Sequence, residues 1–86
     1  MPRFYINYRN RDRGTQAEMV ARDEVGIEVS GIEQARAAAL VSAREMLADD
    51  VRFDSPHPME SVFITDETGQ EVMTIAAVDV MPKTAR

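Results

Sequence analysis

The residues with the clearest chemical potential are three arginines at alternate positions near the start of the chain. Arg9, Arg11 and Arg13 follow Tyr5 and Tyr8 closely in the sequence. Guanidinium groups bind phosphate oxygens and aromatic rings stack on bases, so this combination is typical of a phosphate or nucleic-acid contact. The alternative is that each arginine pairs with one of the chain's own carboxylates. We therefore treat the three arginines as the possible contact residues for phosphate or nucleic acid.

The distribution of charge disfavours nucleic acid as a partner. The 86 residues carry a net charge of −5, but residues 1–14 carry +3 and the remainder carries −8. An acidic surface repels nucleic acid at long range. Any binding of this kind would depend on the local arginine cluster alone.

Two acidic turns suggest a metal site at first sight. Asp23-Glu24-Val25-Gly26 and Asp66-Glu67-Thr68-Gly69 share an Asp-Glu-x-Gly pattern. A calcium loop needs oxygen ligands at alternating positions over about twelve residues, and neither segment provides that series. Both segments instead favour turns in which aspartate accepts from the backbone and glycine takes positive φ. We expect no metal and no other cofactor.

No arrangement of residues predicts catalysis. His57 is the only histidine and lies between Pro56 and Pro58, without a neighbouring nucleophile that forms a recognisable motif. The chain has no cysteine, and its four glycines are dispersed rather than gathered into a phosphate-binding loop. We expect no catalytic residue and no enzymatic activity.

One helix is indicated from Ser30 to about Val51. Ser30-Gly31-Ile32-Glu33 has the spacing of a capping box, in which the serine hydroxyl and the glutamate carboxylate bind each other's backbone N–H groups. At helical spacing the apolar side chains form one stripe. The stripe consists of Ile32, Ala35, Ala39, Leu40, Ala43, Met46 and Leu47.

Short strands are expected on both sides of this helix. Alternating or β-branched residues predict strands over residues 3–9, 17–21, 61–65 and 71–78, with a brief extended piece at 27–29. The chain is therefore expected to be a single α+β domain over residues 1–86, with a frayed tail at 81–86. Its sheet should be a small antiparallel sheet of three to four strands with one amphipathic helix packed across one face, in the order β-β-α-β-β.

The second pair of strands suggests an interaction surface. A turn in which Asp66 faces Gln70 would pair Ile64 with Val72 and Phe63 with Met73, which leaves both faces of the hairpin apolar. One helix covers only one face. We expect self-association, or binding of another protein, through the other face. The possible interface residues are Phe63, Met73 and Ile75, or the opposite set of Val62, Ile64, Val72 and Ala76.

Several strings resemble a family of short uncharacterised bacterial proteins of one domain each, which open with Met-Pro-Arg and an aromatic strand. The strings are Met1 to Tyr5, Asp23 to Glu28, the alanine-rich Glu33 to Leu40, Leu47-Ala48-Asp49 and Thr65 to Gly69. The resemblance runs nearly end to end and implies the fold, but the family is a domain of unknown function and transfers no site. The arginine-rich turn at residues 9–13 departs from the family pattern. A looser architectural likeness is to small antitoxin-type domains.

These observations lead to a functional hypothesis. No apolar run approaches the ~18 residues of a membrane span, and no signal peptide is visible, so we expect a cytoplasmic protein without membrane contact. We expect a small non-catalytic interaction module that forms a homodimer through the uncovered sheet face. The alternative is a nucleic-acid-associated or antitoxin-like protein that uses Arg9, Arg11 and Arg13.

Overall fold

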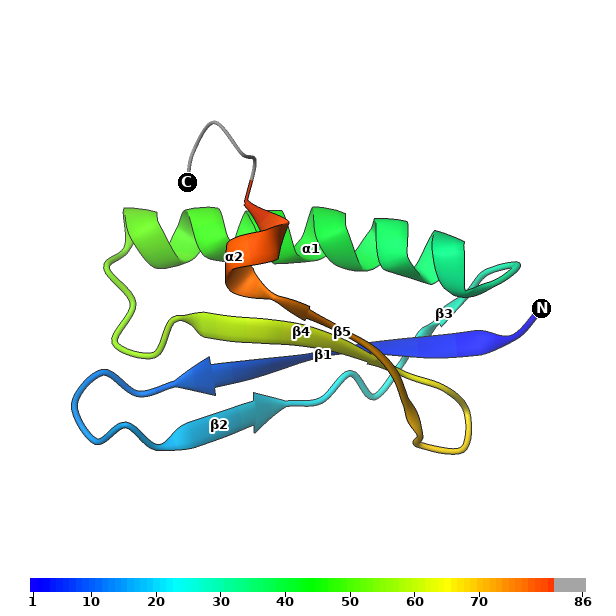
Figure 1. Ribbon diagram of the computed structural model, residues 1–86, viewed down its shortest axis with the longest axis horizontal. Helices are drawn as coiled ribbons and strands as arrows, with labels where there is room; N and C mark the ends of the chain where they lie inside the picture. Colours follow the sequence, from blue (N-terminus) through cyan, green and yellow to red (C-terminus); the bar gives the residue numbers. More distant parts are fainter. Residues whose placement is uncertain (82–86) are drawn as a thin grey trace.

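The computed structural model describes residues 1–81, in which a long helix lies lengthwise over an antiparallel sheet (Figure 1). The elements in chain order are β1 (Arg3–Arg11), β2 (Glu18–Ala21), β3 (Ile27–Glu28), α1 (Ile32–Arg52), β4 (Met59–Thr65), β5 (Glu71–Ala76) and α2 (Ala77–Val80). The α+β prediction is confirmed. The structure adds pairing for the short β3, and it ends the last strand at Ala76, where a strand to Val78 was expected. Of the predicted frayed tail 81–86, residues 82–86 lie outside the described residues.

The sheet is arranged around β1 and β4. Its strand order is β2-β1-β4-β5, and β3 also pairs with β1. Because β4 occupies one edge of β1, the two short strands β2 and β3 share the other edge, at opposite ends of β1. Strand β2 is consequently an outer strand of the sheet, and so is β5.

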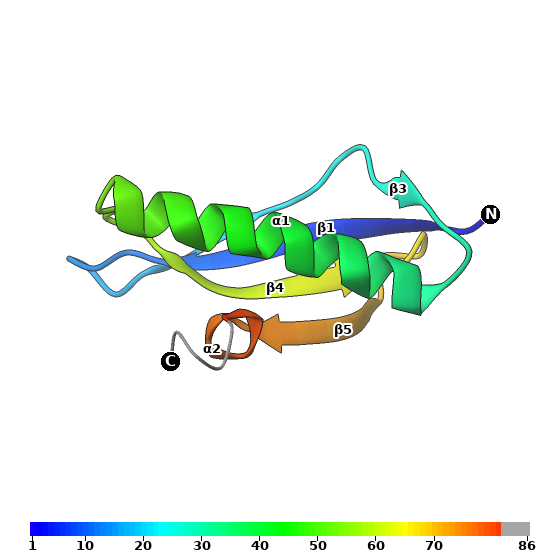
Figure 2. The same ribbon diagram turned by 90° about the horizontal axis from the view of Figure 1, so that it is seen from above.

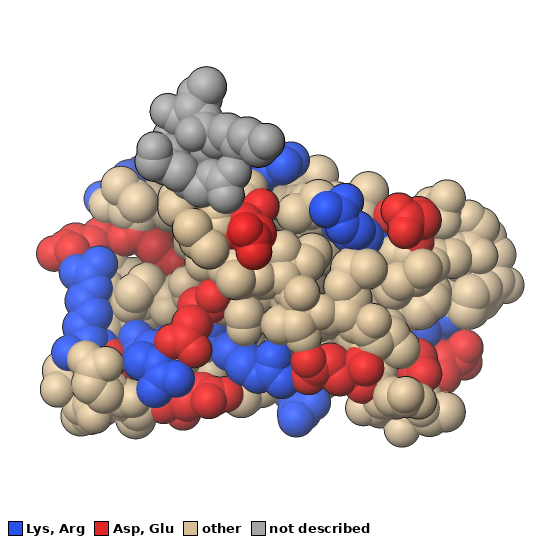
Figure 3. All heavy atoms as spheres, in the orientation of Figure 1, with Lys and Arg blue, Asp and Glu red and all other residues tan. Residues whose placement is uncertain are grey.

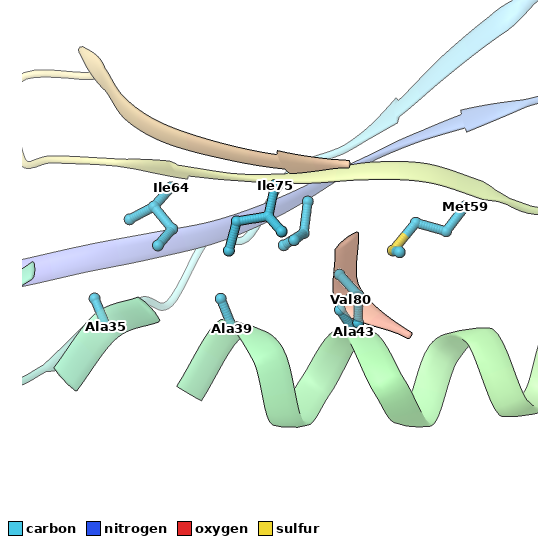
Figure 4. Packing of buried hydrophobic residues seen from close by; sticks show 8 residues of the cluster. Ala35, Ala39, Ala43, Met59, Ile64, Ile75 and Val80 are labelled. Atoms are coloured by element: carbon cyan, nitrogen blue, oxygen red, sulfur yellow. The ribbon is translucent and has the colours of Figure 1, made fainter. Parts of the chain in front are cut away.

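Helix α1 approaches the sheet closely because its contact stripe is made of alanine. Ala35, Ala39 and Ala43 are fully buried and point at the sheet, where they meet Ile64 and Ile75 (Figure 4). Spacing of four residues places the three methyl groups in one row along the helix. The predicted apolar stripe is confirmed, since the larger side chains at its margins pack against the same core. These are Ile32, Leu40, Met46 and Leu47.

The start of α1 differs from the prediction. The helix begins at Ile32, its N-cap is Gly31 with an extended backbone, and no side chain caps it. The Gly31 carbonyl accepts from the Ala35 N–H at 3.2 Å. The predicted capping box is therefore wrong, because Ser30 lies one residue outside the position that a capping hydroxyl must occupy.

The register of the β4–β5 hairpin is also different. Asp66 does face Gln70, with its N–H donating to the Gln70 carbonyl at 3.0 Å. Between Ile64 and Thr65 the register then shifts, so that Ile64 pairs with Met73 and Phe63 with Thr74. The residue skipped on β5 is Val72, which makes this irregularity a β-bulge. One extra residue moves every later side chain of β5 to the other face of the sheet.

Candidate functional site

The face of the sheet opposite α1 is a layer of ion pairs. Arg9 binds Glu71 at 2.6 Å across β4, and Arg11 binds Glu60 at 2.6 Å. The hydrogen bond from Arg11 lowers the pKa of Glu60, and the same hydrogen bond raises the pKa of Arg11. We call this side of the sheet the outer face.

The three arginines of the predicted phosphate contact therefore each have a carboxylate partner. Arg13 completes the set by binding Asp54 at 2.8 Å, in the loop after α1. Acidic and basic side chains alternate along the sheet side of the molecule (Figure 3). The arrangement matches the alternative to a phosphate or nucleic-acid contact, in which each arginine pairs with one of the chain's own carboxylates.

Phe63, Met73 and Ile75 do not share one face of the sheet, as the predicted interface assumed. The bulge at Val72 turns Met73 and Ile75 toward α1, where Ile75 is buried and Met73 packs against the core. Phe63 alone lies on the outer face, and it is only 3% exposed. The Arg9 guanidinium lies 3.9 Å from the centre of the Phe63 ring and covers it as a cation–π contact. Around Phe63, the outer face is thus polar and closed rather than apolar and open.

The two Asp-Glu-x-Gly segments are turns, as their sequence favours. Asp23 accepts from the backbone N–H groups of Ile6, Val25 and Gly26 at 3.0–3.2 Å. Partial burial raises the pKa of the Asp23 carboxyl, but these hydrogen bonds outweigh it and hold the pKa below its usual value. The Asp23 carboxylate therefore stabilises the chain between β2 and β3 by binding backbone groups.

The Asp66 turn follows the same pattern. The Asp66 carboxylate accepts from the Thr68 hydroxyl at 2.6 Å and from two backbone N–H groups, those of Thr68 and Gln70. The hydroxyl contact lowers its pKa. Within residues 1–81, no cluster of three metal-binding side chains occurs.

His57 lies half-buried in the loop between α1 and β4. Its backbone carbonyl accepts from the Asn10 side-chain amide at 3.0 Å, and its N–H donates to the Ser55 hydroxyl at 3.3 Å. The Asn10 contact ties the loop to the end of β1, and the Ser55 contact lies within the loop. They give His57 a structural position at the edge of the sheet.

An open hollow lies on the helix side of the sheet, beside α1. Helix α1 runs above β1 and β4, with the segment that leads to β3 on one side of it and α2 on the other (Figure 2). On the β2 and β3 side the helix leaves about 600 Å³ unfilled. The lining residues are Ile6, Tyr8, Ala21, Arg22, Asp23, Ile27, Ala38, Ser42 and Met46. Most of these side chains are apolar, and the Tyr8 and Ser42 hydroxyls hydrogen-bond to each other within the lining.

Strand β2 borders this hollow and is exposed at all four positions. Two apolar side chains of β2 are partly exposed, Met19 on the helix side at 44% and Val20 on the outer face at 46%. As an outer strand, β2 also presents unpaired backbone groups along its free edge. The hollow and β2 together form an apolar feature that residues 1–81 leave uncovered, and we call them the open flank.

Sequence reasoning missed the open flank for an identifiable reason. The strand at 17–21 was expected, but its place at the edge of the sheet depends on strand order, which the local pattern does not encode. The small residues Ala21, Ala38 and Ser42 were the available signal, because small side chains facing one another leave space between a helix and a sheet.

Residues 1–81 contain no helix that is long and apolar enough to cross a bilayer. Searches of curated proteins and of solved structures gave no match. The sequence does match the family described as a domain of unknown function, DUF6894, over residues 3–78. This match spans the whole sheet and α1, in accordance with the resemblance noted from the sequence. The chain therefore belongs to the DUF6894 family.

Proposed function

We propose that this protein is a non-catalytic interaction module that self-associates through its open flank, with a second copy of the chain as the occupant. The observation that carries the proposal is the combination of an unfilled apolar hollow with an exposed edge strand at its border. The proposal keeps the homodimer predicted from the sequence and moves its interface from the outer face to the helix side and edge of the sheet.

The chemistry of the open flank supports association rather than catalysis. Its lining is dominated by aliphatic side chains, and its carboxylate, Asp23, is engaged by three backbone N–H groups. A general base needs a free, positioned acceptor within reach of a substrate. An apolar surface beside a free strand edge gains free energy by being covered.

A second copy fits this edge better than an unrelated partner because of its charges. The free edge has an acidic residue, Glu18, at one end and a basic residue, Arg22, just beyond the other end. An antiparallel copy of the same strand presents the opposite order of charge. Two-fold symmetric dimers are the commonest soluble oligomers, and antiparallel pairing of the same strand has this symmetry.

The oligomeric state tests the proposal directly. Sedimentation velocity and light scattering, measured from low micromolar to about millimolar concentration, should show a dimer of the 9.6 kDa chain. The variant Val20→Pro should be a monomer, because proline removes the N–H that Val20 presents to the free edge. The matched control Val20→Thr keeps this N–H and the branched side chain, so it should remain a dimer.

Two outcomes would overturn the proposal. One is a wild-type protein that stays monomeric at millimolar concentration. The other is a dimer that Val20→Pro leaves intact while its circular dichroism and melting temperature match those of the wild type. A monomer that binds duplex DNA at low salt, and loses this binding when Arg9, Arg11 and Arg13 are replaced together, would favour the nucleic-acid alternative.

A further inference from the structure

We infer that the two copies pair antiparallel along β2 with Val20 on the two-fold axis, so that Glu18 of each copy faces Arg22 of the other. The inference rests on the proposed self-association and specifies its geometry. It follows from the hydrogen-bond pattern between β1 and β2 and from the order of residues 18–22.

The hydrogen-bond pattern identifies which residues of β2 face the free edge. The Asp12 N–H donates to the Ala17 carbonyl at 2.9 Å. Asp12 and Ala17 adjoin the pair formed by Arg11 and Glu18, so they are a hydrogen-bonded pair at the end of the β1–β2 ladder. Hydrogen-bonded and non-hydrogen-bonded pairs alternate along an antiparallel ladder. Met19 and Ala21 therefore direct their backbone groups toward β1.

Glu18 and Val20 consequently direct their N–H and carbonyl groups away from β1. Arg22 continues this alternation, and the Asp23 N–H turns back to bind the Asn7 side chain at 2.9 Å. Three alternate residues thus offer donors and acceptors along the free edge. A second strand can bind all three only if it runs beside residues 18–22.

The side-chain charges select one register among those that the backbone allows. With Val20 opposite Val20 of the second copy, Glu18 lies opposite Arg22 at both ends of the contact. A shift of one pair in one direction places Glu18 against Glu24 of the second copy, which is a repulsive contact. A shift in the other direction places Glu18 against Val20 and removes both charge pairs. The register centred on Val20 is the only one of these three with opposite charges at both ends.

The contacts of Glu18 and Arg22 within one chain leave room for this pairing. Glu18 lies 3.6 Å from Arg9 and 3.9 Å from Arg11, so its contacts with these arginines are long. The Arg22 guanidinium lies 5.9 Å from the centre of the Phe63 ring, at the rim of the outer face. In the dimer, Glu18 and Arg22 would extend the ion-pair layer of the outer face from one copy to the next.

The same register covers part of the open flank. Met19 and Ala21 lie on the helix side of β2, and the pairing sets Met19 beside Ala21 of the second copy. Because paired residues of an antiparallel ladder share a face, the axis stands perpendicular to the sheet and both α1 helices lie on the same side of it. The two hollows then meet across the axis as one trough between the two helices.

Charge reversal with recombination tests this register. Glu18→Arg and Arg22→Glu, each studied alone, place like charges at both ends of the contact. Each should self-associate about tenfold more weakly than the wild type at low ionic strength. An equimolar mixture of the two variants restores opposite charges at both ends, so native mass spectrometry and sedimentation should show a heterodimer. The fraction of heterodimer should fall as the salt concentration is raised, because salt screens exposed charges.

The outcomes separate the register from the proposed function. A monomeric wild type overturns both. If the wild type is a dimer that neither charge reversal weakens, the register is overturned and self-association stands. The same conclusion follows if both variants are weakened but their mixture forms no heterodimer. Circular dichroism of each variant controls for folding, because Glu18 also contacts Arg9 and Arg11. Recombination provides a second control, since misfolded variants would not regain association on mixing.

Discussion

Single residues hold the turns of this protein in place, and Gly26 is the clearest case. Its φ is +77°, in the left-handed region, and a Cβ built there would meet three atoms at 2.9 Å: Cγ of Arg3, the carbonyl oxygen of Phe4 and Cε1 of Tyr5. Gly69 has a similar φ of +86° but nothing within 4 Å of its Cβ position. The two Asp-Glu-x-Gly turns therefore have the same backbone demand and very different surroundings.

Replacement of these two glycines by alanine should separate backbone strain from crowding. Gly69→Ala should lower the free energy of unfolding by about 1–2 kcal/mol, the cost of placing a side chain in the left-handed region. Gly26→Ala should cost a further 1–3 kcal/mol or so, because the new methyl group also collides with β1. Urea denaturation of both variants measures the difference. Equal losses of unfolding free energy in the two variants would show that β1 shifts to accommodate the new methyl group at residue 26 without an energetic cost.

At the same scale, the sequence predicted the turns but not their surroundings. Aspartate and glycine at fixed spacing encode a turn, which is local chemistry. That Asp23 binds the Ile6 N–H depends on β2 and β3 meeting the same edge of β1, seventeen residues away in the sequence. Contacts of this kind follow from the topology and have no local signature.

At the scale of elements, α1 illustrates how small side chains set a packing distance. Its central contact row consists of Ala35, Ala39 and Ala43, each fully buried. The hydrophobic period predicted this row, and the small size of alanine allows the close approach of helix and sheet. The row leaves no space for a longer side chain, whereas the neighbouring Ala37 is exposed on the opposite side of the helix.

The same substitution at two helix positions tests this packing. Ala39→Leu should lower the free energy of unfolding by about 1–3 kcal/mol, because the added atoms must push the helix away from the sheet. Ala37→Leu should change it by less than about 0.5 kcal/mol, since this side chain faces solvent. Thermal unfolding and urea denaturation report both values. A small loss at Ala39 would mean that α1 shifts on the sheet without cost.

The β4–β5 hairpin shows where prediction from pattern reaches its limit. The turn at Asp66 was predicted correctly, but a single extra residue, Val72, inverted the faces assigned to Met73 and Ile75. The apolar pattern does not distinguish the two registers, because Phe63 and Ile64 are both apolar. The bulge places Ile75 in the core and leaves Arg9 to cover Phe63. The interface set of Phe63, Met73 and Ile75 depended on the predicted register, so in the structure these three residues do not share the uncovered face.

At the scale of the whole molecule, stability should depend on ionised carboxylates. Hydrogen bonds lower the pKa of Asp12, Asp23, Asp66, Glu60 and Glu71 in the folded state. A carboxylate whose pKa is depressed by folding stabilises the fold above its unfolded pKa, and this contribution is lost as the pH falls through the folded value. The relevant unfolded values are 3.8 for aspartate and 4.5 for glutamate.

These lowered carboxylate pKa values determine how stability should vary with pH. The urea midpoint should be nearly constant from pH 7 to pH 5 and should fall steadily below about pH 4.5. Asp23→Asn should lower the midpoint at pH 7, and its gap to the wild type should narrow at acidic pH, where Asp23 is protonated in both states. A profile that stays flat down to pH 3 would contradict the assignment of these carboxylates to stabilising roles.

The interrupted edge of β1 has a consequence for how far assembly can proceed. Between β2 and β3 the Ile6 N–H donates to the Asp23 carboxylate. A strand from a neighbouring chain therefore cannot pair with β1 in the gap between β2 and β3. At the other margin of the sheet, β5 is bent by its bulge and passes directly into α2. A polymer would need a regular free strand edge at both margins of the sheet, whereas residues 1–81 offer a short regular edge at β2 and an irregular edge at β5. We therefore expect a finite assembly that resists growth into fibrils, even though part of its backbone remains unpaired.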